Sequence, residues 1–366
     1  ISSVMVADSK RLVSLDVFRG FTIFSMLLVN NPANDMAYPS WFRHARWGQG
    51  LTFCDMILPW FLFIMGVAIP FSFSSFLKRK GSRFLFLLKS LRRSFVLILL
   101  GIIINCSISR AIVVKMDVLQ LLGFSYIVSV LIYFLPRWFR ICVSVFLIIG
   151  YYVLLKFIPF GGNPGGTLEE YNNIIYYLNT RFLSRYHLSG IISVVPSSVI
   201  VTLGTVVGDI LRSEFSHSRK FLTLLILGVG TLSIGWLWSI DIMFSKSIWT
   251  PSYVLFSSGI GCIILSLFYY LIEIREYRSW GFVFKVFGMN AITAYFVSIV
   301  VRVHTLEEWC LTLKNASDIT LKEAIISRAI GSLGLYCGSW AYTLGYVSFW
   351  WLVLFIMYRR KIFVRI

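Results

Sequence analysis

The feature that most constrains the fold of this chain is a succession of long apolar segments separated by short polar ones. A helix needs about 20 predominantly apolar residues to cross the hydrocarbon core of a membrane. About ten segments of this kind are present, with boundaries that carry errors of roughly 2–4 residues. They lie near residues 15–30, 51–76, 94–108, 118–135, 141–157, 195–211, 220–240, 252–273, 284–302 and 333–357.

The composition agrees with this assignment and excludes a soluble protein. Hydrophobic residues make up 58% of the 366 residues and charged residues only 14%, whereas soluble domains contain about 45–50% and about 25% of them. The loops between the segments leave no room for a separate soluble domain. We therefore predict an all-α fold, a polytopic transmembrane helical bundle of about 10 spans that forms one domain over residues 1–366.

The formal net charge of +18 would also suit a nucleic-acid-binding protein, but the topology explains it better. Lys and Arg gather in alternate loops, as the positive-inside rule expects of cytoplasmic loops. Examples are Lys10-Arg11, the stretch from Lys78 to Arg93, and Arg359 to Lys361. We place both termini and these loops in the cytoplasm. The loops 31–50, 106–117, 158–194, 241–251 and 303–332 fall on the opposite side.

Cysteines and glycines indicate helix packing. The six cysteines are scattered without a CxxC pair, so they predict packing residues with no disulfide framework and no metal site. Gly204 with Gly208, and Gly334 with Gly338, have the GxxxG spacing that lets helices approach closely. Such faces would also permit a homodimer. The cysteines are Cys54, Cys106, Cys142, Cys262, Cys310 and Cys337.

Polar residues concentrate in the first sixty residues. Asp16 and Arg19, three residues apart, can pair along one helix face. Asp55 lies where it can cap the second segment. His44 lies among aromatic residues that include Trp47. Its neutral imidazole could act as a base near neutral pH, or it could belong to an interfacial aromatic belt.

Two further groups are expected on the same outer side. One contains Lys246 and Trp249 and enters the eighth segment, and the other contains Asn290 in the ninth. A tryptophan beside a cation suits a sugar, because the ring stacks on the indole and the cation binds hydroxyl groups. The competing interpretation is an anchor at the membrane interface.

The chain resembles the heparan-α-glucosaminide N-acetyltransferase family and its bacterial relatives. The resemblance runs in order along nearly the whole chain. The matching stretches are R-L-x-S-x-D-x-F-R-G at Arg11–Gly20, V-N at Val29-Asn30, H-A-x-W at His44–Trp47, P-W-F-x-F-I-M-G at Pro59–Gly66, R-S-F at Arg93–Phe95, I-I-N at Ile103–Asn105, V-L-Q at Val118–Gln120, W-T-x-S-Y-V at Trp249–Val254, G-M-N-A at Gly288–Ala291 and Y-R-x-K-I-F at Tyr358–Phe363.

The resemblance implies an acetyl-CoA-dependent N-acetyltransferase. In this family the acetyl group passes from cytosolic acetyl-CoA to an amino sugar on the other side of the membrane. The family's active-site His corresponds to His44 and its neighbouring Asn to Asn30. The resemblance also implies a multi-pass protein of the bacterial inner (cytoplasmic) membrane, with membrane lipid, acetyl-CoA and an amino sugar as partners and no nucleic acid.

The sequence departs from the family pattern in three places. One extra residue separates His44 from Asp55. Leu121-Leu122 stand where an Arg often follows V-L-Q-x, and Ser245-Lys246 replace an Asn-Lys pair. These differences bear on the donor-binding and acceptor-binding residues.

The expected mechanism passes the donor through the bundle, because a polyanion cannot cross hydrocarbon. Lys89, Arg92 and Arg93 would bind the nucleotide phosphates, and the matched Asn105 and Gln120 would contact the donor. At the outer end His44 would take the proton of the amine, oriented by Asp55, and Asn30 would stabilise the oxyanion. Direct transfer and an acetyl-His44 relay both stay open. The alternative function is a sugar or amino-sugar transporter without acyl-transfer chemistry.

Overall fold

The computed structural model describes residues 12–311 and 319–364, and in these residues the chain is almost entirely helical. Lys10 and Arg11, part of one predicted cytoplasmic cluster, lie outside the described residues. The α-helices are α1 (Val13–Val29), α2 (Phe53–Lys78), α3 (Arg83–Ser109), α4 (Val118–Tyr133), α5 (Arg137–Phe157), α6 (Ile174–Leu178), α7 (Val194–Arg212), α8 (His217–Trp238), α9 (Pro251–Tyr269), α10 (Phe282–Met289), α11 (Ala291–Val301) and α12 (Leu321–Arg359).

Short elements fill the connections between these helices. Two strands form an antiparallel pair in which Cys310 faces Thr320. The short helical elements and strands are η1 (Asp35–Ala37), η2 (Ser40–Phe42), η3 (Asn179–Leu183), η4 (Ser184–Tyr186), η5 (Ile191–Ser193), η6 (Tyr270–Ile274), η7 (Arg302–Leu306), β1 (Cys310–Leu311) and β2 (Ile319–Thr320).

Nine of the ten predicted segments each coincide with one helix and the segment 284–302 with the two helices α10 and α11, so the prediction of an all-α fold is confirmed. Within the described residues, 6 helices could cross a membrane by length and composition, or up to 7 if the bent pair α10 and α11 counts as one span. The two members of that pair meet at an angle of 76°. The count of ten and the side on which the termini lie stay predictions.

The difference between six and ten has a physical origin in the remaining helices. At 1.5 Å per residue, the 17 residues of α1 and the 16 of α4 reach only about 25 Å. The hydrocarbon core is about 30 Å thick. Helix α3 is longer but carries Lys89, Arg92 and Arg93 in its first half. Helices α1, α3 and α4 would therefore cross a membrane only as parts of the bundle, packed against its other helices.

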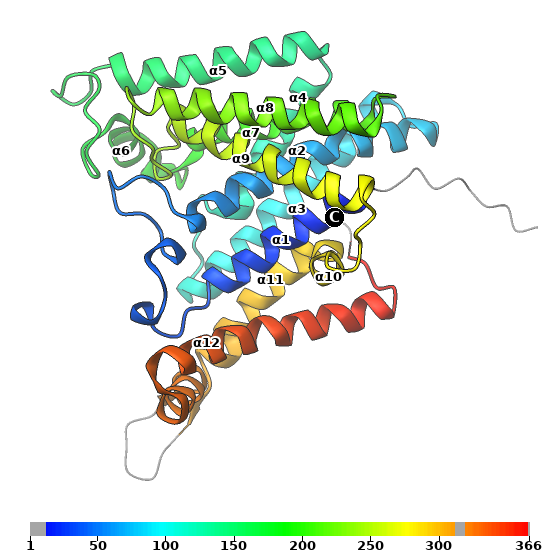
Figure 1. Ribbon diagram of the computed structural model, residues 1–366. Helices are drawn as coiled ribbons and strands as arrows, with labels where there is room; N and C mark the ends of the chain where they lie inside the picture. The colour runs from blue at the N-terminus through cyan, green and yellow to red at the C-terminus, as the bar shows by residue number, and fades with distance from the viewer. Residues whose placement is uncertain (1–11, 312–318, 365–366) are drawn as a thin grey trace, which may run out of the picture.

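Glycines set the closest helix contacts at the centre of the bundle. A Cβ atom at Gly66 of α2 would lie 2.0 Å from the carbonyl oxygen of Val201 in α7, and one at Gly204 would lie 2.4 Å from that of Phe63. Helices α1 and α10 meet in the same way, since a Cβ at Gly20 would overlap the backbone of Phe284. Helices α5 and α8 lie at the periphery (Figure 1), and only 28% and 17% of their most apolar stretches are buried.

The two predicted GxxxG pairs behave differently. Gly204 and Gly208 both face the backbone of α2, so that prediction is confirmed. Gly334 instead interrupts α12 with a φ of 78°, a left-handed conformation that favours glycine. Gly338 packs against Ala329 in the first half of its own helix. The second pair therefore folds α12 back on itself, so that residues 321–333 form a separate helical arm within the predicted loop 303–332.

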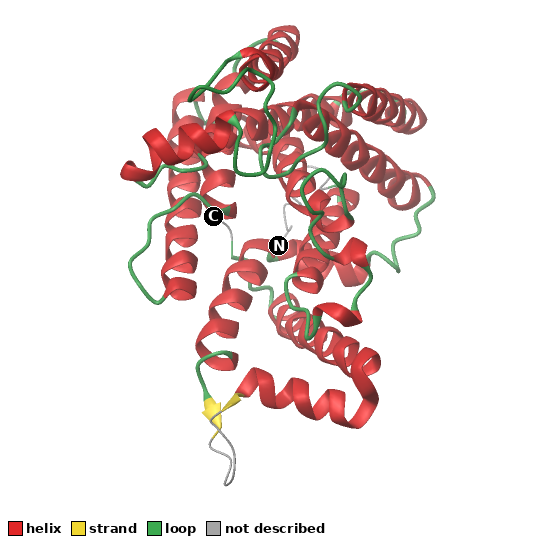
Figure 2. Cartoon of the chain, turned by 90° about the vertical axis from the view of Figure 1, so that its left-hand side faces the viewer, coloured by secondary structure: helices red, strands yellow, loops and turns green. Residues whose placement is uncertain are grey.

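The long loops gather at one end of the bundle. Figure 1 shows the connection after α1 and the region around α6 at its left-hand end, and Figure 2 looks onto this end. At the opposite end the start of α1 meets η6, where the Ser14 amide donates to Glu273 over 3.1 Å. The C-terminal segment also lies there, since the amide of Val364 donates to the side chain of Asn290.

Gly66→Ala should destabilise the protein by about 1–3 kcal/mol, the usual cost of forcing a methyl group into a packed interior. The matched control is Gly230→Ala in α8, where a Cβ would meet nothing within 4 Å. Thermal unfolding in detergent measures both variants. Equal unfolding midpoints for the two variants would contradict the close α2–α7 contact.

Candidate active site

A cavity of about 750 Å³ opens at the loop end of the bundle. Its walls come from α1, α2 and α4 and from four of the five loops that the sequence places on one side. Asn30, His44, Met116, Gly190 and Lys246 represent these segments. Four of these loops therefore meet at one cavity, while the side of the membrane on which they lie stays a prediction. The complete set of candidate residues in the wall is Asn30, His44, Trp47, Asp55, Lys246 and Trp249.

The loop between α1 and α2 carries His44 and is held in place by aromatic and polar contacts. The Tyr38 hydroxyl lies 2.8 Å from the Ser339 carbonyl oxygen and 2.6 Å from the Thr343 hydroxyl, both in α12. Phe42 packs beside Tyr38 and is buried. The loop then returns to the bundle at Thr52, the N-cap residue of α2.

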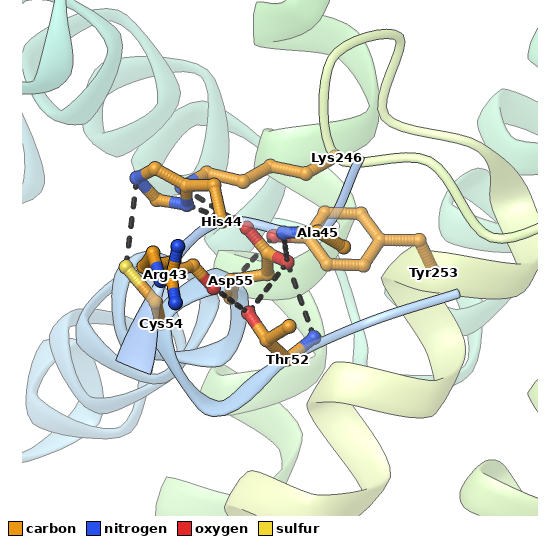
Figure 3. A network of polar contacts seen from close by, with 8 residues as sticks. All are labelled: Arg43, His44, Ala45, Thr52, Cys54, Asp55, Lys246 and Tyr253. Atoms are coloured by element: carbon orange, nitrogen blue, oxygen red, sulfur yellow. Dashed lines mark hydrogen bonds and ion pairs between the residues drawn. The ribbon is translucent and has the colours of Figure 1, made fainter. Parts of the chain in front are cut away.

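Asp55 joins the start of α2 to the His44 loop (Figure 3). Its Oδ2 accepts hydrogen bonds from the amides of Thr52 and Ala45, each 3.1 Å away. Its Oδ1 lies 2.7 Å from His44 Nδ1. The predicted helix cap is therefore present, and the same side chain also contacts His44 despite the extra residue between them. Asp55 is only 3% exposed, which protects these bonds from water.

His44 presents its other ring nitrogen to the cavity. Because a carboxylate can only accept, Nδ1 carries the hydrogen of the bond to Asp55, and Nε2 is left to bind or release a proton. The hydrogen bond to Asp55 raises the pKa of His44 to about 9, even though the side chain is 58% exposed. This pairing of an imidazole with a carboxylate fixes the tautomer and the ring orientation.

Lys246 reaches this pair from the loop between α8 and α9. Its Nζ lies 3.1 Å from His44 Nδ1 and 3.7 Å from Asp55 Oδ1. Since Nδ1 already donates to Asp55, the ammonium interacts chiefly with the carboxylate. Burial lowers the pKa of Lys246. The sequence places this lysine among sugar ligands, whereas its nearest contacts in the structure are His44 and Asp55.

Asn30 is the residue at which α1 ends, and it lies at a wall between two cavities. A second cavity of about 210 Å³ is present on the other side of this wall. Both cavities are lined by Val29, Asn30, His44 and Cys54. A group held at this wall is therefore open to reactants on two sides.

The two predicted tryptophans lie on the wall of the larger cavity. Trp47 donates from Nε1 to the carbonyl oxygen of Leu168, which ties the His44 loop to the long loop before α7. Trp249 is buried, packs edge-on against Tyr253 and adopts a φ of 52°. Tyr253 in turn donates to the carbonyl oxygen of Asp55 over 2.7 Å. Both tryptophans are thus fixed elements of the cavity.

Asn290 lies elsewhere. It occupies the break between α10 and α11 and is almost fully buried. Its side chain donates to the carbonyl oxygen of Ile362 over 3.0 Å and accepts from the amide of Val364. It does not line the cavity around His44. The structure therefore separates Asn290 from the other outer-side candidates, because the sequence placed it in one straight span and the span is broken.

The five predicted donor-binding residues lie on α3 and at the start of α4. None of them lines the His44 cavity. Lys89 and Arg92 are exposed, while Arg93 stacks on Tyr126 at 4.7 Å. Asn105 is buried and donates to the Lys115 carbonyl oxygen. Gln120 is buried too, and within the described residues neither polar atom of its side chain has a hydrogen-bond partner.

A narrow apolar seam leads from the cavity into the bundle. It is formed by α1, α2, α4 and α11 and has a free volume of about 10 Å³. Met26, Leu58, Val118 and Tyr295 line both the seam and the His44 cavity. The seam is also lined by Leu119 and Leu122 of α4, whereas the Gln120 side chain lies against Gly101 of α3.

Cys54 is the residue of the site that the sequence did not indicate. Its Sγ lies 3.5 Å from His44 Nε2, so the expectation that all six cysteines serve packing alone is incomplete. The only available signal was its position directly before Asp55. The other early prediction holds: Arg19 and Asp16 pair at 3.3 Å, away from the cavity.

Comparison with known proteins identifies relatives over most of the chain. Residues 11–240 match a family model described as heparan-alpha-glucosaminide N-acetyltransferase, catalytic. The human protein named heparan-alpha-glucosaminide N-acetyltransferase is 28% identical over 424 aligned residues, which cover 97% of this chain and 60% of the human protein. The mouse protein of the same name is 26% identical, with 98% and 61% covered. The chain thus spans about 60% of the length of these curated relatives.

Replacing Asp55 should lower the pKa of His44 from about 9 toward the ordinary value near 6.5. Asp55→Asn removes the carboxylate charge that stabilises the imidazolium, so the neutral ring appears at lower pH. The measurement is the pH dependence of His44 carbethoxylation, followed by peptide mass spectrometry. Asp35→Asn, an exposed acid on the second cavity, is the control and should leave the midpoint unchanged. A midpoint near 6.5 in the unmodified protein would contradict the pairing.

Proposed function

This chain belongs to the heparan-alpha-glucosaminide N-acetyltransferase family, and on that premise we propose that it transfers an acetyl group from acetyl-CoA to the amine of a glucosamine-type sugar. The observation that carries the proposal is His44, which is held by Asp55 through Nδ1 and lies at the wall between two cavities. An acyl transfer between two substrates needs a base that both reactants can approach. A membrane carrier needs no such base.

The chemistry at this wall is a proton transfer coupled to attack on a thioester. In its neutral form His44 takes, through Nε2, the proton that the amine loses as its nitrogen bonds to the acetyl carbon. Because the pKa of His44 is about 9, this neutral form increases as the pH rises toward 9. General base catalysis of this kind contributes about 10²–10⁴-fold to a rate. Asn30 also lines both cavities. It would donate a hydrogen bond to the oxygen of the tetrahedral intermediate, which contributes on the order of 3 kcal/mol in well-placed cases.

The larger cavity is the better place for the sugar. Trp47 and Trp249 offer rigid aromatic surfaces on its wall, and Glu170 lies there as well. The positive charge of Lys246 beside His44 disfavours a second cation at the same point. An amino sugar that enters therefore loses its ammonium proton more easily, which exposes the lone pair that attacks the thioester.

The donor reaches this wall from the cytosolic side in the proposed topology, with both termini in the cytoplasm of a bacterial inner membrane. The uncharged pantetheine arm would run between the helices, and the apolar seam that shares four residues with the His44 cavity would have to widen from its free volume of about 10 Å³ to admit it. Gln120 is proposed to contact the donor as well, although its unpaired side-chain amide lies against Gly101 of α3 and does not line the seam. The phosphates would remain at Lys89, Arg92 and Arg93, more than a dozen residues from the outer end of α3.

His44→Ala should lower turnover by at least about 100-fold, because the proton acceptor is lost. The measurement is formation of N-acetylglucosamine from acetyl-CoA and glucosamine by the detergent-purified protein. His187→Ala is the matched control, since His187 is exposed and lines neither cavity. Full activity of the His44 variant would exclude the proposed base.

An assay in sealed vesicles distinguishes an acetyltransferase from a transporter. In sealed vesicles, accumulation of labelled glucosamine without any consumption of acetyl-CoA would overturn the acyltransferase proposal and favour a permease. Consumption of acetyl-CoA that depends on glucosamine, with one acetylated sugar formed for each CoA released, is the result we expect.

Arg92→Ala combined with Arg93→Ala should raise the KM for acetyl-CoA about 10-fold or more and leave the KM for the sugar unchanged. Loss of charge-assisted hydrogen bonds to phosphate weakens donor binding alone. Arg181→Ala with Arg185→Ala removes the same charge from the loop end and should leave both constants unchanged. An unchanged donor KM in the first variant would remove these arginines from the donor site.

A further inference from the structure

Cys54, His44 and Asp55 form a chain of contacts in which the histidine and the carboxylate can activate the cysteine thiol. Its Sγ lies 3.5 Å from His44 Nε2, and His44 Nδ1 lies 2.7 Å from Asp55. A nucleophile beside a base that is itself oriented by a third group is the general arrangement of covalent acyl-transfer sites. Among the other described cysteines, Cys106 and Cys262 contact backbone carbonyl oxygens instead.

We propose that Cys54 is the nucleophile that carries the acetyl group between acetyl-CoA and the amine. The inference rests on the proposed function and deepens it, since it divides one transfer into two half-reactions. His44 then serves both halves, first for the thiol and afterwards for the amine.

Cys54 lies in positive electrostatic surroundings. It is the second residue of α2, a helix of 26 residues, and the positive end of a helix dipole stabilises an anion. Lys246 lies within electrostatic range of it.

The position of Cys54 suits a carrier. Its side chain is 6% exposed, and the small open surface faces both cavities, which share it as a wall residue. An acetyl group on Sγ would be open to the donor side and the acceptor side in turn. Two substrates that approach a membrane protein from opposite faces then need not occupy the site together.

In the first half-reaction the Cys54 thiol proton moves to His44 Nε2, and Sγ bonds to the acetyl carbon of acetyl-CoA. The bond from that carbon to the CoA sulfur breaks, and CoA leaves as a thiol with the proton from His44. One thioester replaces another, so no oxidant or further reactant is needed. The backbone N–H groups of Phe53 and Cys54 in the first turn of α2 have no partner within the helix and can donate to the oxyanion, whereas that of Asp55 already donates to the Thr52 carbonyl oxygen.

In the second half-reaction the sugar nitrogen bonds to the acetyl carbon while its proton moves to His44. The bond to Sγ breaks, and the proton passes from His44 to the departing sulfur. The products are an N-acetyl sugar and the free Cys54 thiol. The sum of the two steps is acetyl-CoA plus amine giving amide plus CoA.

The test is acetylation of the purified wild-type chain by isotope-labelled acetyl-CoA without any acceptor. We expect one acetyl group per chain, located on the peptide that contains Cys54, removed by neutral hydroxylamine and chased into N-acetylglucosamine when glucosamine is added. Peptide mass spectrometry separates this site from His44, ten residues away. Label on His44, or no label in a wild-type protein that turns over, would overturn the inference.

Substitution of Cys54 gives a second, independent test of the covalent carrier. Cys54→Ala and Cys54→Ser should lose the label and reduce turnover by at least about 1,000-fold, as removal of a nucleophile does. Cys142→Ser replaces an exposed cysteine of α5 and should keep both. Detergent size-exclusion profiles and unfolding midpoints equal to wild type show that the variants are folded. Wild-type turnover in a folded Cys54→Ala variant would contradict the covalent carrier and leave the acetyltransferase proposal intact.

The two proposals fail in different ways. A wild-type chain that neither becomes labelled nor consumes acetyl-CoA with glucosamine would overturn both. Label on Cys54 that water alone removes, with no N-acetylglucosamine formed, would support the carrier and reject glucosamine as the acceptor.

Discussion

The site depends on one buried carboxylate. Asp55 holds the first turn of α2 through Thr52, the preceding loop through Ala45 and the imidazole through His44. A charge this deeply buried is stable only when its oxygen atoms are fully paired, and here the partners are a backbone cap and a histidine. Since the same residue ends a loop, begins a helix and orients a base, none of these three features can move independently of the others.

The charges around this carboxylate explain the chemistry of the cavity. Lys246 and His44 supply two cations beside the single anion Asp55, and the start of α2 adds a positive dipole. The balance favours groups that become negative during acyl transfer, such as a thiolate or a tetrahedral oxyanion. It also opposes the protonated form of an incoming amine. One arrangement therefore serves both substrates.

The sequence predicted helices far better than side-chain contacts. Hydropathy located every long helix, because lipid requires each backbone group to be paired within a segment. The grouping of the four loops that line the cavity was predicted from the distribution of Lys and Arg along the chain. His44 and Asp55 were singled out by residue type and position, and the family resemblance gave His44 its expected role, but the bond across an extra residue depends on how the loop at Tyr38 folds. The predicted position of Asn290 at the outer side was wrong, because nothing in the local sequence pattern indicates the 76° bend beside it. Cys54 was missed because a thiol in an apolar helix has the same pattern as a packing residue.

The distance along the chain between His44 and Lys246, 202 residues, has a consequence for biogenesis. At about 5–20 residues per second of synthesis, Lys246 emerges roughly 10–40 s after His44. The first two helices and the His44–Asp55 bond can form early, while the wall that contains Lys246 and Trp249 is absent. Reactive groups of the nascent chain are thus assembled into a closed site only when α9 joins the bundle. Packing of that helix is therefore the step that completes the cavity around His44.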